Sequence, residues 1–173
     1  ALVFQPVKHF FDRLTDKFFY RGSYDQSEFI IELGRVLTST TDVNELMARS
    51  TDLIQKTFKS LFVKLVVFGD EMTVATAGKA QPALENDRTM ELRDWLVSAR
   101  GRVCLVDQMP HDLSLLHRAL KKRRAVLLLP LEKSDDLVGY VVLGEQLGAG
   151  YTRRDMQTLE AIADELVIAL ENA

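Results

Sequence analysis

Two short apolar segments near the carboxyl end, residues 125–131 and 137–143, are separated only by a polar stretch, EKSDD. Apolar runs of this length, bounded by a turn signal, are typical of buried strands, and so short a connection favours antiparallel pairing. A Gly-containing loop then leads into a long amphipathic helix. Thr152 can cap this helix, and Asp155 stands where it completes a capping box. The chain is therefore expected to pack a buried sheet against a long terminal helix.

Apolar residues in this helix recur at alternating intervals of three and four. They are Met156, Leu159, Ala163, Leu166 and Leu170. This spacing is that of a heptad seam, where the helices of two chains pack together. Ile162, Val167 and Ala169 lie off the seam and widen the apolar face, so that one stripe can pack on the sheet and another on a second copy. We expect a homodimer through the terminal helices; the alternative is one broad stripe facing the core of a monomer.

The rest of the chain predicts further helices and strands. Helices are expected at 26–37, after Asp42 with Glu45 at the capping-box position, around Trp95 and after Asp112; strands are expected at 61–68, 72–77 and 102–106. Short turns between neighbouring strands favour an antiparallel sheet of about five or six strands with helices on both faces. The terminal helices would cover one face together. The middle helices would cross the other face and leave a cavity.

Residues 1–24 form a separate predicted unit, and residues 25–173 form the main domain. The first unit is rich in aromatic and basic residues, and Phe11, Leu14 and Phe18 share one helical face. This composition is typical of a helix at a membrane interface. The alternatives are a helix that folds back on its own domain or one that packs against its twin in a dimer.

Several local patterns resemble a GAF domain, the α/β module that senses small molecules. They are VKLVVFGDEMTVATAG, RVCLVDQMP and the segment from Ala125 to Ala173, with Pro130, Gly139, Gly144, Tyr151, Asp155 and Leu159. The resemblance covers roughly Gln26 to Ala173. It implies an α+β sensor fold, a small-molecule or protein partner and a regulatory role in signal transduction.

The first segment, PVKHFFDRLTDKFFYRGSYD, resembles the stretch that joins a membrane-spanning region to a GAF domain in bacterial sensor histidine kinases. That resemblance implies a cytoplasmic module of a two-component system, held near a membrane, whose terminal helix continues into the kinase's dimerisation helices. The chain itself contains neither a phospho-acceptor His motif nor an ATP-binding Gly motif.

Candidate catalytic and metal-binding residues are few. His9, His111 and His117 do not stand at a zinc-ligand spacing with a third ligand nearby. A haem on His117 is possible in the family that the chain resembles, but surface histidine is the favoured interpretation. No Ser, His and acid form a recognisable catalytic motif. We therefore predict no enzyme activity and no metal site for this fragment, and the sequence identifies no cofactor.

Cys104 is the only cysteine, so the chain has no intrachain disulfide and no cysteine metal cluster. It stands in a predicted strand between apolar residues, which predicts a buried, inert thiol. GAF-fold reductases use several cysteines for sulfoxide chemistry, and one cysteine cannot complete that cycle. The family residues around a bilin-linking cysteine do not match either, and the cyclic-nucleotide signature of phosphodiesterase GAF domains is missing.

The densest basic cluster consists of Arg118, Lys121, Lys122, Arg123 and Arg124. It can contact a phosphate or an anionic lipid, but the favoured interpretation is structural, since cations complement the carboxyl end of a helix and their stems cover apolar surface. The formal net charge of −3 argues against a general nucleic-acid binder.

A ligand cavity is expected between the sheet and the middle helices. The residues placed near it are Phe68, Trp95, Val106, Met109 and Leu116. Each of them also fits a packed core. The leading hypothesis is a non-catalytic sensor module, and the alternative is a ligand-free dimerisation spacer. A void of roughly 300 Å³ or more favours the first, and a filled core favours the second.

Overall fold

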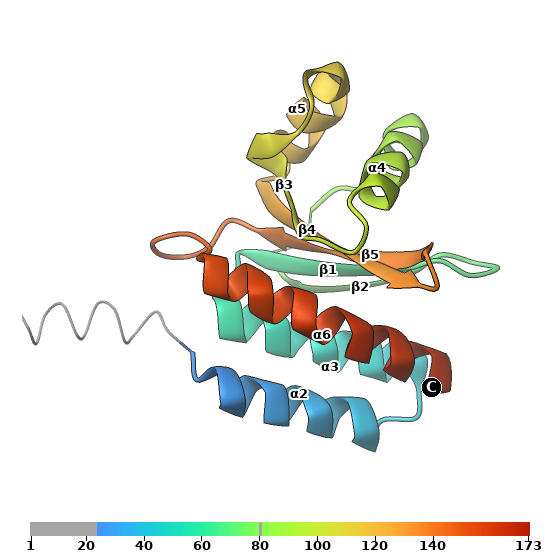
Figure 1. Ribbon diagram of the computed structural model, residues 1–173, viewed down its shortest axis with the longest axis vertical. Coiled ribbons are helices and arrows are strands. Elements are labelled where there is room, and N and C mark those ends of the chain that lie inside the picture. Colours follow the sequence, from blue (N-terminus) through green and yellow to red (C-terminus); the bar gives the residue numbers. More distant parts are fainter. Residues whose placement is uncertain (1–23, 80) are drawn as a thin grey trace, which may run out of the picture.

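A five-stranded antiparallel sheet separates two layers of helices (Figure 1). The computed structural model describes residues 24–79 and 81–173. In chain order the elements are α2 (Gln26–Ser39), α3 (Val43–Phe58), β1 (Phe62–Val67), β2 (Thr73–Gly78), α4 (Asn86–Ser98), β3 (Cys104–Leu105), the 3-10 turns η1 (Val106–Gln108) and η2 (His111–Leu113), α5 (Ser114–Lys122), β4 (Ala125–Lys133), β5 (Asp136–Gly144) and α6 (Arg153–Asn172). The predicted α+β fold is confirmed.

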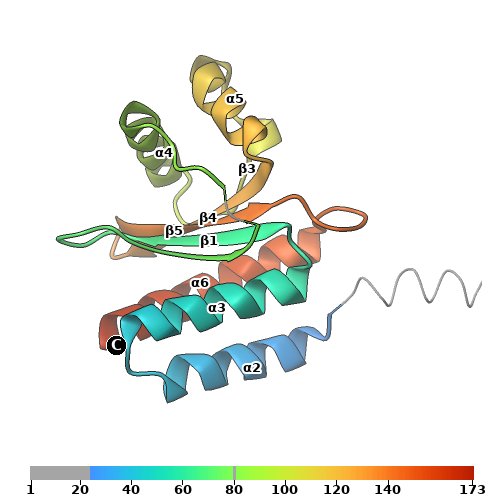
Figure 2. The same cartoon turned by 180° about the vertical axis from the view of Figure 1, so that it is seen from behind.

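The strands run in the order β2-β1-β5-β4-β3, and every pair is antiparallel. One face is covered by α3 and α6, with α2 outside them, as the view from behind shows (Figure 2). The other face carries α4 and α5. The terminal helices therefore lie together and the middle helices cross the opposite face, as the element order predicts.

The central strands are buried on both faces, so each contributes to two separate cores. In β5, Val141 and Leu143 belong to the core on the α3 and α6 side, which we call the lower core. Tyr140 and Val142 alternate with them and belong to the upper core, under α4 and α5. This alternation follows from the two-residue period of a strand. It explains why the strands read as nearly continuous apolar runs.

A two-residue turn joins β4 to β5. Ser134 and Asp135 both have positive φ angles, 49° and 69°, which is the conformation that hairpin turns of this length favour. Lys133 then pairs with Asp136. The two strands therefore extend further into the polar stretch than their apolar runs indicate.

Two of the three predicted helix caps are present. At α6 the Asp155 backbone N–H donates to Thr152 Oγ1 at 3.1 Å, and the Thr152 N–H donates to Asp155 Oδ2 at 2.8 Å. At α3 the Asp42 carboxylate accepts from the backbone N–H of Glu45 at 2.9 Å. The cap predicted at Asp112 is wrong, because that residue lies inside η2 and α5 begins only at Ser114.

Two glycines of β5 allow a close approach to β1. A Cβ atom on Gly139 would lie 2.3 Å from the Val66 carbonyl oxygen, and one on Gly144 would lie 2.5 Å from the Phe62 ring. Tyr151 fixes the same region, because its hydroxyl donates to the Gly144 carbonyl and lies 2.6 Å from Ser60 Oγ. These contacts give a physical reason for three residues of the sequence pattern.

Residues 1–23, which include most of the predicted linker, lie outside the described part of the chain. Tyr24 is the last residue of the predicted linker. Its ring packs edge-on against Phe58, with centroids 4.8 Å apart. Among the described helices, none combines the length and the apolar character that crossing a membrane requires.

We predict that Gly139→Ala lowers the free energy of unfolding by about 2 kcal/mol, because the added methyl group overlaps a backbone carbonyl that cannot rotate away. Urea denaturation followed by circular dichroism measures the change. Gly34→Ala is the matched control: no atom lies within 4 Å of its added Cβ, and alanine favours a helix. An unchanged midpoint for Gly139→Ala would show that β1 and β5 can separate locally.

Candidate functional site

The five residues predicted for a ligand cavity all belong to the upper core. Val106 and Leu116 are 1% and 0% exposed. Phe68, Trp95 and Met109 are partly buried and pack against the same cluster. The structure therefore brings the five together between the sheet and the middle helices. None of the five lines the cavity described next, so their contact with a ligand stays a prediction.

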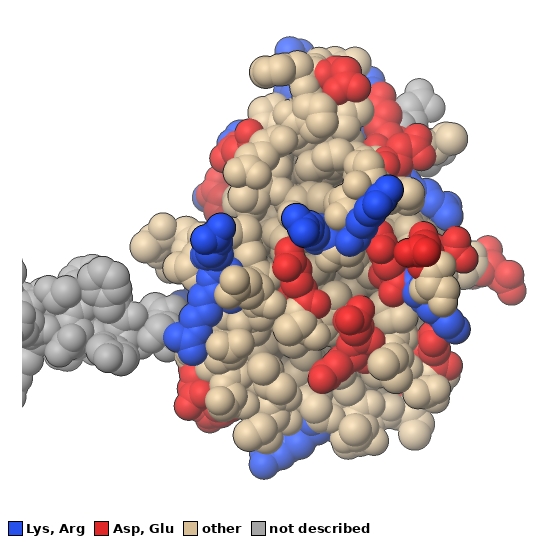
Figure 3. Space-filling view, in the orientation of Figure 1, with Lys and Arg blue, Asp and Glu red and all other residues tan. Residues whose placement is uncertain are grey.

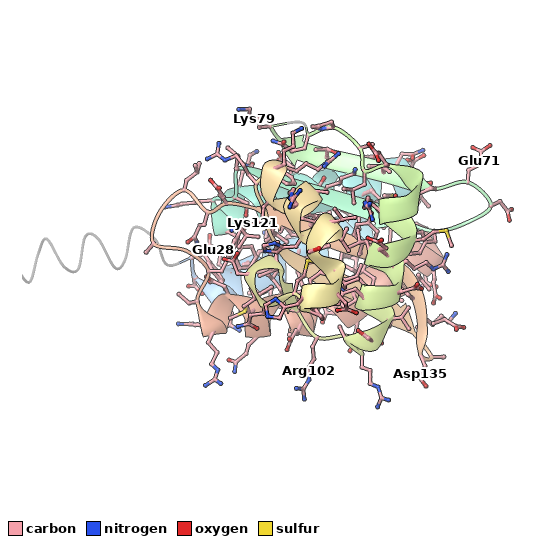
Figure 4. All side chains as sticks on the ribbon, turned by 90° about the horizontal axis from the view of Figure 1, so that it is seen from above. Glu28, Glu71, Lys79, Arg102, Lys121 and Asp135 are labelled. Carbon is pink, nitrogen blue, oxygen red and sulfur yellow. The ribbon has the colours of Figure 1, made fainter. Side chains whose placement is uncertain are left out.

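That cavity, here called the sheet cavity, lies over β1, β4 and β5 and holds about 70 Å³. Its apolar walls include Phe62 and Val142 from the sheet, Leu92 from α4 and Leu120 from α5. The segment 81–84 closes one side. Figure 4 looks onto this layer and shows α4 and α5 lying over the sheet. The middle helices thus leave a cavity where the element order predicts one, but a small one.

Lys64 is the charged residue that the sheet contributes to the cavity. It alternates with Phe62 and Val66 along β1, so its side chain is on the upper face. Burial, followed by the charge of Arg123, lowers the pKa of the Lys64 amine. Within residues 24–79 and 81–173 it has no hydrogen-bond or ion-pair partner. A single lysine in an otherwise apolar strand was the one signal of this position in the sequence.

Arg123 contributes the second positive charge. Its Nε donates to the Pro82 carbonyl at 2.9 Å and its Nη2 to the Ala83 carbonyl at 2.8 Å. Its Nη1 donates to the Ala119 carbonyl at 2.9 Å. These bonds hold the guanidinium at the cavity and tie the segment 81–84 to the end of α5. The sequence placed Arg123 in a basic cluster without distinguishing it from its neighbours.

Two of the other four members of the basic cluster are paired on the surface. Lys121 contacts Asp107 at 2.7 Å, and Arg124 Nε donates to Glu145 at 2.9 Å. The Lys121 contact lowers the pKa of Asp107. Basic and acidic side chains are also interspersed over the face in Figure 3. These contacts support the structural interpretation for Lys121 and Arg124.

Tyr140 lines the cavity from β5 and is 5% exposed. Its ring lies 5.9 Å from the Phe68 ring, centroid to centroid. Burial raises the pKa of its phenol to about 12, so the hydroxyl stays neutral and can donate a hydrogen bond. In the described part of the chain that hydroxyl has no protein partner.

A larger hollow of about 430 Å³, here called the terminal groove, lies between the carboxyl ends of α2 and α6. Leu37 and Ile168 supply apolar walls, and Glu165 is its charged residue. The groove is open to the surface and lies on the side of the molecule opposite the sheet cavity. Three isoleucines on these helices are exposed: Ile30 to 36%, and Ile31 and Ile168 to 58% each.

The predicted dimer seam faces the protein's own sheet. Leu159, Ala163 and Leu166 are 0%, 6% and 1% exposed, and Met156 and Leu170 pack beside them on the lower core. Their assignment as intermolecular contacts needs correction, because α6 packs on β4 through this stripe. Spacings of three and four describe a helix on a sheet as well as a coiled coil, so the pattern could not separate the two.

Cys104 is 7% exposed, and burial raises the pKa of its thiol to about 11. This environment matches the predicted inert thiol. His111 is exposed and His117 is half-buried. Within the described residues no three His, Cys, Asp or Glu side chains are grouped so that they could hold a metal ion.

No protein-family model and no curated protein sequence matches the chain. Several solved structures do. The phycocyanobilin-bound GAF domain of a cyanobacterial phytochrome has a TM-score of 0.67 and 15% identity, over 87% of this chain and 96% of that one. The GAF domain of a phosphoenolpyruvate-protein phosphotransferase from Coxiella burnetii has 0.61 and 14%, over 86% and 94%.

A free methionine-R-sulfoxide reductase from Neisseria meningitidis, in complex with its substrate, has a TM-score of 0.63 and 16% identity, over 85% of this chain and 89% of that one. Structural similarity at sequence identities this low establishes a shared fold and no more.

We predict that Cys104 in the native protein reacts with iodoacetamide at pH 8 about a hundredfold more slowly than in guanidinium chloride, because a pKa near 11 leaves little thiolate. Mass spectrometry of the alkylated fraction against time gives both rates. Comparable rates in the two conditions would show that the thiol is accessible and ionised.

Proposed function

Because the chain has the GAF fold, we propose that it is a non-catalytic regulatory sensor domain of a signal-transduction protein. The observation that carries this proposal is the position of the sheet cavity relative to α6. The cavity and α6 lie on opposite faces of the same strands, β4 among them. A ligand that moves Tyr140 or Val142 therefore acts on a strand whose next residues, Val141 and Leu143, support the terminal helix.

Two polar contacts hold α6 to the sheet in addition to its apolar stripe. Glu160 accepts a hydrogen bond from the Val103 backbone N–H at 2.9 Å, and Glu171 pairs with Lys133 near the β4–β5 turn. A change in the sheet thus reaches both halves of the helix. Such a change requires that a ligand bind two arrangements of the helix with different affinity.

The finer context rests on the sequence resemblance of residues 6–25. We propose a sensor histidine kinase of a two-component system, with this domain on the cytoplasmic side of a membrane. Lack of a catalytic role is supported by the buried state of Cys104, since sulfoxide chemistry of the multi-cysteine kind needs accessible thiolates.

The small volume of the sheet cavity favours a second candidate function. About 70 Å³ is well under the roughly 300 Å³ of pockets that hold drug-sized ligands. A ligand-free dimerisation spacer needs no cavity at all. The sensor proposal therefore requires either a very small ligand or a wider cavity in the bound state.

We propose that the homodimer uses the exposed face of α2 and α6. Ile30 shares a helical face with Gly34 and Leu37, which line the terminal groove, and Ile168 lines it from α6. Exposed isoleucines beside a groove of about 430 Å³ are apolar surface that a second copy can bury.

Native mass spectrometry of protein purified from cells tests the sensor proposal. A retained small molecule in a dimer supports it. An unliganded dimer would favour the spacer. Unliganded monomer at every concentration would overturn both.

We predict that Ile168→Glu weakens the dimer by about tenfold or more while the fold stays intact, because the carboxylate replaces an exposed apolar contact. Analytical ultracentrifugation measures the dissociation constant. Leu166→Glu is the contrasting variant: its side chain is 1% exposed, so the charge should cost more than about 4 kcal/mol and unfold the domain. A folded Leu166→Glu monomer would restore the original seam as the dimer contact.

A further inference from the structure

The sheet cavity gathers positive charge without a counter-charge. Lys64 and Arg123 both line it, and none of its lining residues within the described chain is acidic. Two carboxylates are already paired with other members of the basic cluster: Asp107 with Lys121, and Glu145 with Arg124. Within the part of the chain that the structure describes, the two positive charges therefore face a largely apolar space that no acidic side chain lines.

Unused hydrogen-bond donors accompany that charge. A guanidinium has five N–H groups, and three of those of Arg123 donate to the carbonyls of Pro82, Ala83 and Ala119. The Lys64 ammonium and the Tyr140 hydroxyl have no acceptor among residues 24–79 and 81–173. Three side chains from β1, β5 and the end of α5 thus have free donors at one cavity.

This arrangement is costly for the empty protein. Removing an ammonium from water is unfavourable, and a neighbouring guanidinium adds repulsion. The lowered pKa of Lys64 has both causes, with burial the larger. A bound anion would offset the repulsion between Lys64 and Arg123 with an attraction. It would also accept the hydrogen bonds that the Lys64 ammonium and the Tyr140 hydroxyl can donate. Lys64 is only half-buried, so this cost is partial, but perturbed charges of this kind cluster at functional sites.

The size and the walls of the cavity restrict the anion. Phe62, Leu92, Leu120 and Val142 present hydrocarbon rather than donors. A phosphate has acceptor oxygens on all sides and would leave some of them against these walls. A carboxylate has its acceptors at one end and a hydrocarbon part at the other. The volume of about 70 Å³ leaves room for a short hydrocarbon part only.

We propose that the sheet cavity binds a small organic carboxylate, of a size between acetate and butyrate, through Lys64, Arg123 and Tyr140. The hydrocarbon part packs on Phe62, Leu92 and Leu120. The assignment rests on the proposed sensor function and names the ligand class for the same cavity. Neutralising Lys64 and Arg123 would draw β1 and the end of α5 toward the ligand.

Titration of the full chain with sodium butyrate, followed by proton–nitrogen NMR at constant ionic strength, tests this assignment. We expect saturable shifts at Leu92, Leu120 and Val142. Butyramide has nearly the same shape but no charge, and it should bind at least about tenfold more weakly. Constant ionic strength is needed because added salt screens exposed charges.

Lys64→Met removes the ammonium and keeps a flexible apolar side chain. It should weaken butyrate binding by about tenfold or more. Lys122→Met is the matched control, because it changes the net charge equally at an exposed position of α5 that does not line the cavity. It should bind butyrate as the wild type does.

A thermal unfolding scan of ligand-free Lys64→Met adds a readout independent of binding. Its Tm should rise by a few degrees, because an unpaired half-buried charge is gone. A lower Tm together with unchanged butyrate binding would make Lys64 a structural residue and overturn the assignment.

Equal binding of butyramide and butyrate, or tighter binding of inorganic phosphate than of butyrate, would also overturn the assignment of the ligand as a carboxylate. The sensor proposal would survive that result if native mass spectrometry still found another small molecule in the dimer. Failure of butyrate together with an unliganded protein from cells would overturn both.

Discussion

Burial of β1, β4 and β5 on both faces is the constraint from which the rest of the structure follows. Because successive side chains of a strand point to opposite sides, such strands need apolar residues at nearly every position. Val141 and Leu143 support one helical layer, while Tyr140 and Val142 support the other. The two cores are thus only one residue apart along the chain. A displacement in one helical layer can therefore reach the other layer through a single strand.

The same constraint decides what α6 does with its apolar stripe. Two helices, α3 and α6, must cover the lower face of the sheet, and the stripe that includes Leu159 and Leu166 is buried there. The residues left for a partner are those on the far side, such as Ile168 at 58% exposed. A heptad-like spacing in a helix that ends a sheet domain therefore indicates burial first. The spacing does not show whether the surface that covers the stripe belongs to the same chain or to a second copy.

Much of the fold could be predicted because its signals are local. Thr152 and Asp155 lie three residues apart and bond to each other, and the apolar runs before and after Ser134 mark β4 and β5. The failures have the opposite character. The start of α5 depends on the two 3-10 turns before it, and a plausible capping residue such as Asp112 cannot reveal them. Gly139 shows the limit well: the sequence pattern includes it, but the reason for a glycine there is the carbonyl of Val66 on the neighbouring strand.

The polar lining of the sheet cavity could not be predicted for a related reason. Lys64 and Arg123 are far apart in sequence, and their meeting depends on where the end of α5 returns to the sheet. The apolar pattern indicates Trp95 and Leu116, large apolar residues of the right layer, and these pack in the upper core. An apolar pattern identifies where a core forms, since burial stabilises it. It does not identify where the core is incomplete.

The unpaired charge also bears on the choice between sensor and spacer. A spacer is under no requirement to keep a lysine in the middle of an apolar strand, and a hydrophobic residue of similar volume would fill the same position at lower cost. Tyr140 is consistent with this argument, because its hydroxyl has no protein partner within the described residues and phenylalanine would pack equally well against Phe68. Both residues are easier to understand if the cavity is occupied for part of the time. The small volume of the cavity then restricts the size of the ligand and does not exclude a ligand.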